Sequence, residues 1–168
     1  TLTVSVGGAV PAVKASARFD SLDLNQLLDK RVLAMKTLGG STGQSLAGAL
    51  STGVHGSDFD RGTLADIVRA IHLVGPGGTQ HWIEPTSGIT DPIGLATALG
   101  PDCTIHYDDD WFNSVLVSMG SMGIIYALII EVEPQYDLVH SCEHFSWDTM
   151  RTRLQAHGNA DDPFAGYR

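Results

Sequence analysis

Basic residues and cysteines are scarce in this sequence, and each shortage argues against a class of function. Its 168 residues include 10 Lys and Arg against 19 Asp and Glu, which gives a formal net charge of -9. Nucleic-acid binding depends on clustered Lys and Arg, so we expect no nucleic-acid partner. The two cysteines, Cys103 and Cys142, form no CxxC pair, which argues against a disulfide framework and against cysteine-based zinc sites.

Long apolar runs are missing as well. The longest mainly apolar run, 122–130, is far shorter than the roughly 20 residues that a membrane-spanning helix requires. The sequence therefore predicts no membrane span, and it contains no visible signal peptide. It begins with Thr1 at what reads as the start of a strand, so we expect a fragment or a processed chain.

One segment lacks charge altogether. Residues Leu38–Ser57, called the glycine-rich segment below, read LGGSTGQSLAGALSTGVHGS and include six glycines but no Asp, Glu, Lys or Arg. Glycine lets backbone N–H groups approach another molecule closely, and Ser and Thr add short donors. Residues 45–50 predict one or two helical turns, capped by Ser41 or Thr42. A loop, a short helix and a second loop offer amides to an anion. The segment therefore predicts a site for a phosphate-bearing cofactor, and an exposed connection is the alternative.

Hydrophobic periodicity predicts the remaining elements. The clearest is a hairpin of strands 67–74 and 79–84 across a Gly-Pro-Gly-Gly turn. Residues 124–132 are almost all apolar and predict a buried central strand, whereas 101–106 have no clear assignment. Further strands are expected over 1–6 and 138–145, and helices over 24–28 (capped by Ser21 or Asp23), 93–99, 108–119 and 147–157.

Three patterns in the glycine-rich segment have competing interpretations. Gly39–Ser45 has the outline of a P-loop, but Gln44 stands near the place of the phosphate-binding lysine, and no GxGxxG motif follows a strand. Gly43–Ala47 approaches the nucleophile elbow G-x-S-x-G with Ser45 as nucleophile, although no strand pattern precedes it. His55 either contacts a cofactor or fixes the loop by a local hydrogen bond.

Acidic and histidine clusters do not predict a metal site. The triplet Asp108–Asp110 precedes an apolar helical stripe and is typical of a helix N-terminus. Adjacent helical residues point in different directions and are poorly placed to share one ion. His140 and His144 share a face of the predicted strand, where a half-exposed polar face is the simpler interpretation.

Three segments together resemble one flavoprotein family. The pattern A-G-x-x-x-x-G-x-H-G within 43–57 resembles the second flavin-binding segment of the vanillyl-alcohol oxidase / p-cresol methylhydroxylase superfamily, in its branch of alditol, sterol and aldonolactone oxidases. Residues 62–78 resemble the following hairpin of that family, and 110–128 resemble its helix, glycine turn and buried strand. The similarity covers about residues 20–135. The fixed positions of the pattern are Ala47, Gly48, Gly53, His55 and Gly56.

The resemblance implies a fold and a set of cofactor contacts. The fold would be α+β: the second half of a PCMH-type FAD-binding domain, with a mixed or antiparallel sheet and flanking helices. Residues 1–135 would be this domain without its N-terminal half, and 136–168 would begin a substrate domain or form a C-terminal extension. The implied FAD contacts are Gly40, Ser45, Gly48, Thr52, Gly53, Val54 and His55, with backbone around Gly123, Ile124 and Ile125 at the adenine end.

The implied function is that of an FAD-linked oxidoreductase. It would oxidise a small-molecule alcohol by hydride transfer to the flavin, with oxygen as the electron acceptor. Two alternatives remain: a non-catalytic flavin-domain remnant that acts as a binding module, and a serine hydrolase that uses Ser45. The catalytic base and the oligomeric state have no assignment.

Overall fold

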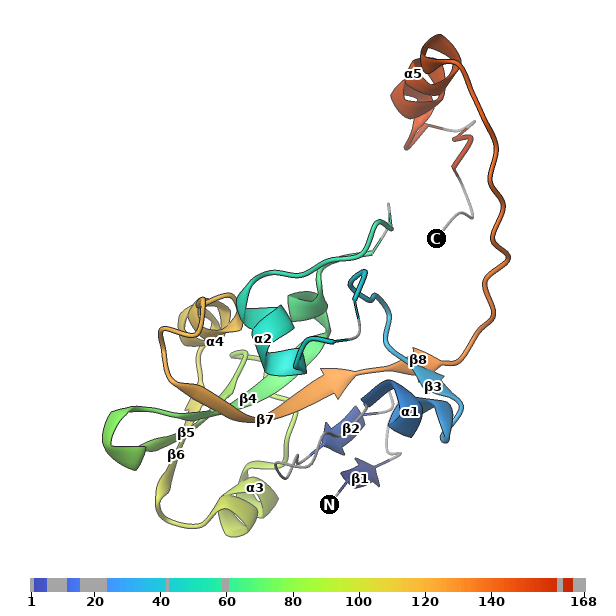
Figure 1. The fold of residues 1–168 in the computed structure, drawn as a ribbon. Helices are drawn as coiled ribbons and strands as arrows, with labels where there is room; N and C mark the ends of the chain where they lie inside the picture. Colours follow the sequence, from blue (N-terminus) through green and yellow to red (C-terminus); the bar gives the residue numbers. More distant parts are fainter. Residues whose placement is uncertain are drawn as a thin grey trace.

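A six-stranded sheet organises the chain, in the strand order β1-β2-β7-β4-β5-β6, and a separate two-stranded sheet pairs β3 with β8 (Figure 1). The computed structural model describes residues 2–5, 12–15, 24–41, 43–58, 61–159 and 162–164. The strands are β1 Leu2–Ser5, β2 Ala12–Ala15, β3 Leu33–Ala34, β4 Val68–Val74, β5 Gln80–Glu84, β6 Cys103–Tyr107, β7 Ile124–Glu131 and β8 Glu133–Pro134. The helices are α1 Leu24–Asp29, α2 Leu46–Ser51, α3 Pro92–Leu99, α4 Asp109–Leu116 and α5 Trp147–Ala156, with short 3-10 turns η1 Leu64–Ile67 and η2 Pro76–Gly78.

The predicted hairpin is confirmed. β4 and β5 pair antiparallel, and the turn between them contains Gly77 and Gly78 with φ of 71° and 82°. Residues with a Cβ rarely adopt this left-handed conformation, so the two glycines allow the chain to reverse here. The other pairings are also antiparallel, except that β6 lies parallel to β5. The fold is therefore α+β with a mixed sheet, as expected.

β7 is central in the sheet, but only its second half is buried. β4 pairs with β7 along one edge, from Ile124 to Ile130. On the other edge β2 pairs only with residues 128–131, so the first half of β7 has no strand partner there among the described residues. Ile124 and Tyr126 are 71% and 62% exposed. The prediction of a buried strand is thus correct for the second half of β7 and wrong for the first.

Helices cover both faces of the β4–β5 part of the sheet (Figure 1). α2 and α4 pack on one face, where Leu50 and Val115 join the main hydrophobic core with Ile71 and other residues of the sheet. α3 packs on the opposite face, where Leu95 meets Trp82. Both expected helices have carboxylate caps: Asp91 accepts from Gly94 N in α3, and Asp108 accepts from Trp111 N in α4.

A buried carboxylate orders the loop after β5. Glu84 is fully buried, and its two oxygens accept hydrogen bonds from Trp82 Nε1, Thr90 Oγ1, Ile89 N and Thr90 N at 2.6–3.2 Å. Its backbone oxygen accepts from Asp108 N, which ties β5 to the start of α4. Burial of an ionised group is tolerated when its hydrogen-bonding capacity is satisfied in this way.

The structure differs from the strand predictions in two segments, 103–107 and 138–145. β6 occupies 103–107, where the sequence has no clear pattern because only Cys103 of this edge strand is fully buried. The predicted strand 138–145 is wrong: residues 135–146 have no regular structure among the described residues, and they lead to α5, which lies away from the sheet (Figure 1). An alternating sequence forms a strand only when a neighbouring strand is present to pair with it.

Most of the other predicted helices and strands are present in the structure. β1, α1, α3 and α5 lie within or close to the predicted ranges. The expected caps of α1, Ser21 and Asp23, lie outside the described residues. No helix in the described part of the chain is long and apolar enough to cross a membrane.

Candidate functional site

The glycine-rich segment contains one short helix, α2, whose start is set by Ser45. Ser45 has φ -69° and ψ 147°, and its side chain accepts a hydrogen bond from Gly48 N at 3.1 Å. The prediction of Ser41 as the cap is wrong, because Ser41 Oγ instead accepts from Gly43 N within the preceding loop. Thr42 lies outside the described residues. The first intrahelical bond runs from Ala49 N to Ser45 O. Because Gly48 N already donates to Ser45, the amides of Leu46 and Ala47 are the ones left for a ligand at this end of α2.

The other end of α2 is a compact turn. Thr52 Oγ1 donates to Gly48 O at 3.0 Å, and Gly53 N donates to Leu50 O at 3.0 Å. Gly53 has φ +68°, a left-handed conformation that favours glycine at a helix C-terminus. Val54 then donates to Ala49 O and accepts from Leu64 N. The turn therefore joins α2 to η1.

His55 fixes the loop locally. Its Nδ1 lies 2.6 Å from Gly56 O, so this nitrogen carries the proton and donates to the carbonyl. Its backbone forms an isolated bridge with Thr63, and the side chain is exposed. Of the two interpretations of His55, the local hydrogen bond is present, and contact with a cofactor stays a prediction.

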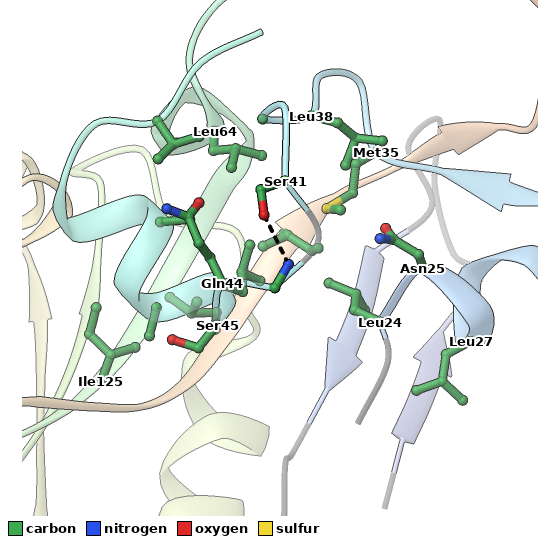
Figure 2. Close-up of a pocket in the computed structure, with 18 of the residues that line it drawn as sticks. Leu24, Asn25, Leu27, Met35, Leu38, Ser41, Gln44, Ser45, Leu64 and Ile125 are labelled. Carbon is green, nitrogen blue, oxygen red and sulfur yellow. Dashed lines mark hydrogen bonds between the residues drawn. The ribbon is translucent and has the colours of Figure 1, made fainter. Parts of the chain in front are cut away.

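An open pocket of about 940 Å³ lies between α1, the glycine-rich segment and β7. Figure 2 shows Leu24, Asn25 and Leu27 of α1 on one side and Gln44 and Ser45 on the other. The volume falls in the range of about 300–1,000 Å³ that is usual for small-molecule sites. The residues that line it are Leu24, Asn25, Gln26, Leu27, Lys30, Met35, Leu38, Gly39, Ser41, Gly43, Gln44, Ser45, Leu46, Ala47, Ala49, Val54, Leu64, Ile125, Tyr126, Ala127, Leu128 and Ile130.

The lining of this pocket differs in charge from the chain as a whole. The sequence has nearly two acidic residues for each basic one. Among the residues that the structure describes, however, the lining includes no Asp or Glu, and Lys30 is its only ionised side chain. Its other polar side chains are the hydroxyls of Ser41, Ser45 and Tyr126 and the amides of Asn25, Gln26 and Gln44. This set of donors suits a ligand that is partly apolar and carries an anionic group.

β7 lines the pocket along most of its length, from Ile125, which is labelled in Figure 2, to Ile130. Gly123, which precedes the strand, has φ +143°, and a Cβ there would lie 2.6 Å from Val74 O. Glycine at this position thus allows β7 to start against β4. Because β2 does not reach residues 124–127, this edge of β7 has no strand partner among the described residues. Its backbone groups lie beside the pocket.

An ion network holds the entry to the glycine-rich segment against the far end of β7. Glu131 forms ion pairs with Lys36 and with Arg69. Burial opposes ionisation of this carboxyl, but the hydrogen bonds from Lys36 and Arg69 outweigh burial and lower the pKa of Glu131. Arg61 pairs with Glu133 at 3.1 Å nearby. None of these charged residues is among the lining residues of the pocket, so the network stabilises the neighbouring backbone and does not contribute to the pocket lining.

The structure gives Ser45 a structural role and brings no histidine to the pocket lining. A nucleophile elbow places its serine on a strained turn after a strand. Ser45 has ordinary extended angles, and β3 ends at Ala34, well before it. The arrangement therefore does not favour the serine-hydrolase alternative.

Three of the ten predicted cofactor contacts line the pocket: Ser45, Val54 and Ile125. Gly40 is exposed and lies between two lining residues. The remaining predicted contacts are not among the lining residues: Gly48 in α2, Thr52, Gly53 and His55 after it, and Gly123 and Ile124 at the start of β7. The sequence interpretation missed the α1 wall, including Lys30. The amphipathic spacing of Leu24, Leu27 and Leu28 predicts the helix but does not indicate that its outer side faces a pocket.

Comparisons with known proteins point in one direction. The chain is 31% identical over 138 residues to a Neurospora crassa protein named as a D-arabinono-1,4-lactone oxidase, a match that covers 82% of this chain and 21% of that protein. It is 26% identical over 136 residues to the alditol oxidase of a Streptomyces species, covering 81% of this chain and 25% of that protein. L-gulonolactone oxidase of Mus musculus is 25% identical over 135 residues, a match that covers 80% of this chain and 26% of that protein.

Solved structures agree on the fold. A solvent-stable cholesterol oxidase superposes with a TM-score of 0.55 at 16% identity, covering 80% of this chain and 24% of that one. The cholesterol oxidase of B. sterolicum gives a TM-score of 0.51. No family model matches the chain. The chain spans about a fifth to a quarter of the length of the proteins that it matches.

Proposed function

We propose that this chain forms part of an FAD-dependent oxidoreductase of the vanillyl-alcohol oxidase / p-cresol methylhydroxylase superfamily. The observation that carries the proposal is the pocket between α1, the glycine-rich segment and the open edge of β7. It combines a ligand-sized volume with neutral donors, and its described lining residues include no carboxylate, which suits a dinucleotide in an acidic chain. The oxidases of sugar lactones and alditols that match about four-fifths of the chain support the same assignment.

In this proposal each wall of the pocket has a separate task. The glycine-rich segment, with Ser45, Gly48 and Val54, holds the cofactor by short side chains and backbone groups. The edge of β7 after Gly123 offers backbone groups to the adenine end. α1 closes the side opposite Ser45. Residues 1–135 would belong to the flavin-binding unit, and 136–168 would begin a second unit.

The chemistry would come from the cofactor. A bound flavin supplies an acceptor for the hydride of an alcohol carbon, and the protein positions the reactants and tunes their environment. The substrate would be a small polyol, sugar-like or sterol-like alcohol, and oxygen would accept the electrons. The described residues of this chain bind and orient the cofactor in this scheme, and none is assigned as the catalytic base.

The visible absorption spectrum of the protein, expressed with any flanking sequence that its gene encodes, tests the proposal. We expect flavin absorption near ~450 nm that accompanies the purified protein. Acid precipitation then separates a covalently linked flavin, which stays with the pellet, from a dissociable one. A colourless protein that also fails to bind added FAD would overturn the proposal and would leave the binding-module alternative.

A further inference from the structure

Lys30 differs from the other basic residues whose side chains the structure describes. Six of these seven have a partner, whereas the amine of Lys30 forms no ion pair or hydrogen bond with any described residue. The six partnered groups are Arg31 on Leu27 O, Lys36 and Arg69 on Glu131, Arg61 on Glu133, Arg151 on Asp148 and Arg153 over the ring of Phe145.

The side chain of Lys30 contributes to the pocket. Lys30 directly follows the last residue of α1 and lines the pocket. The neighbouring carboxylate of Asp29 accepts a hydrogen bond from Gln135 Nε2 at 2.7 Å, and Asp29 is not among the lining residues. The amine therefore belongs to a pocket in which no described lining residue supplies a carboxylate to neutralise it.

Of the lining residues that the structure describes, only Lys30 supplies a full positive charge to the pocket. The opposite wall offers the hydroxyl groups of Ser41 and Ser45 and the amide of Gln44 (Figure 2), which are neutral donors. Neutral donors bind a sugar-like or ribityl hydroxyl nearly as well as a phosphate, but a lysine amine adds a charge-assisted bond that only an anion receives. Among the described lining residues, Lys30 is therefore the side chain that can discriminate between charged and neutral ligands.

We propose that Lys30 is the specificity-determining residue that binds the diphosphate of FAD and discriminates against flavins that lack phosphate. This inference rests on the proposed function, because it takes FAD as the ligand of the pocket. It adds a contact from the residue that follows α1, outside the glycine-rich segment and β7.

The test compares FAD with riboflavin, which has the same ring system but no phosphate. Apoprotein carrying Lys30→Gln is titrated with each flavin, and the quenching of flavin fluorescence gives the dissociation constants. We expect FAD binding to weaken about tenfold, the size of one charge-assisted hydrogen bond, and riboflavin binding to stay within twofold of wild type. Added salt should reduce the wild-type advantage for FAD, because the lysine is exposed.

Two matched variants separate this role from a general loss of charge or of structure. Arg31→Gln removes the same charge one residue further along, where the side chain bonds to Leu27 O and does not line the pocket, so FAD binding should be unchanged. Lys30→Arg keeps the charge and should retain most of the affinity for FAD.

The outcomes distinguish a failure of the proposed function from a failure of the role of Lys30. Wild-type apoprotein that binds neither flavin overturns the proposed function and this inference with it. Wild-type protein that binds FAD, together with a Lys30→Gln variant that binds it equally well, overturns the role of Lys30 alone. Equal weakening of FAD and riboflavin binding also overturns it, because that result would assign Lys30 a structural role.

Discussion

Two loops of this chain differ in how far their polar groups are hydrogen-bonded within the protein. After β5, the donors of the loop converge on the buried carboxylate of Glu84, so its hydrogen bonds are completed inside the protein. In the glycine-rich segment, exposed glycines and serines border an open pocket, and several donors face that space. The first loop is closed to ligands, whereas the second has donors left for one. A binding site can thus be recognised by hydrogen-bonding capacity that the protein does not use itself.

The largest effect should come from breaking the closed loop. Glu84→Gln places an amide NH2 where four donors converge, so at least one backbone or indole N–H loses its acceptor. We expect the free energy of unfolding to fall by about 2–4 kcal/mol, measured by urea denaturation. Asp109→Asn is the control: its carboxylate is exposed and accepts only from Thr86 N, so it should cost less than about 1 kcal/mol. Equal losses in both variants would contradict the special role of Glu84.

A smaller effect should follow from forcing a side chain onto the turn after α2. Gly53→Val keeps ordinary space, since a Cβ would lie 3.5 Å from Val117 Cγ1, but the residue has φ +68°. A branched residue in this conformation should cost about 2 kcal/mol of stability. Thermal unfolding without ligand measures this loss, and a titration with FAD measures the effect on binding. Unchanged stability would show that the turn adopts another conformation.

Acidification should lower the free energy of unfolding, through the histidine pair on β5 and β6. His81 Nδ1 and His106 Nε2 lie 3.1 Å apart, and both rings contact Trp111. Burial, together with His81, lowers the pKa of His106 below its ordinary value of 6.5, although Asp108 opposes the shift. The unfolded chain therefore binds protons more readily, and stability should decrease as the pH falls through 6.5. Denaturation from pH 7.5 to 5.5 tests this, and His106→Gln should flatten the profile.

The smallest effect on stability is expected at the open loop. A Cβ at Gly40 would meet nothing within 4 Å, and its φ lies outside the left-handed region. Gly40→Val should therefore change the free energy of unfolding by less than about 0.5 kcal/mol. If the residue approaches the cofactor, the affinity for FAD should decrease. A stable variant with unchanged FAD affinity would remove Gly40 from the site.

The sequence predicts this fold well where local pattern and burial agree. The hairpin and α4 follow from their sequence patterns, α3 lies close to its predicted range, and the glycine-rich segment indicates the candidate site, whose cofactor contacts stay predictions. The failures come from contacts between distant parts of the chain. Ser45 caps α2 because the preceding loop ends there, β6 exists because β5 is beside it, and 138–145 has a strand pattern without a neighbour. Lys30 lines the pocket because α1 is placed opposite Ser45, and no local pattern reports that placement.

The half-paired edge of β7 has a consequence for how the protein behaves in solution. Residues 124–127 present a strand edge without a described partner, with Ile124 and Tyr126 exposed beside it. Unpaired, apolar edges are templates on which a second chain adds a strand. A ligand that covers this edge would prevent a second chain from pairing with it, and would therefore reduce aggregation. The amount of protein recovered without aggregation should then depend on flavin supply during folding.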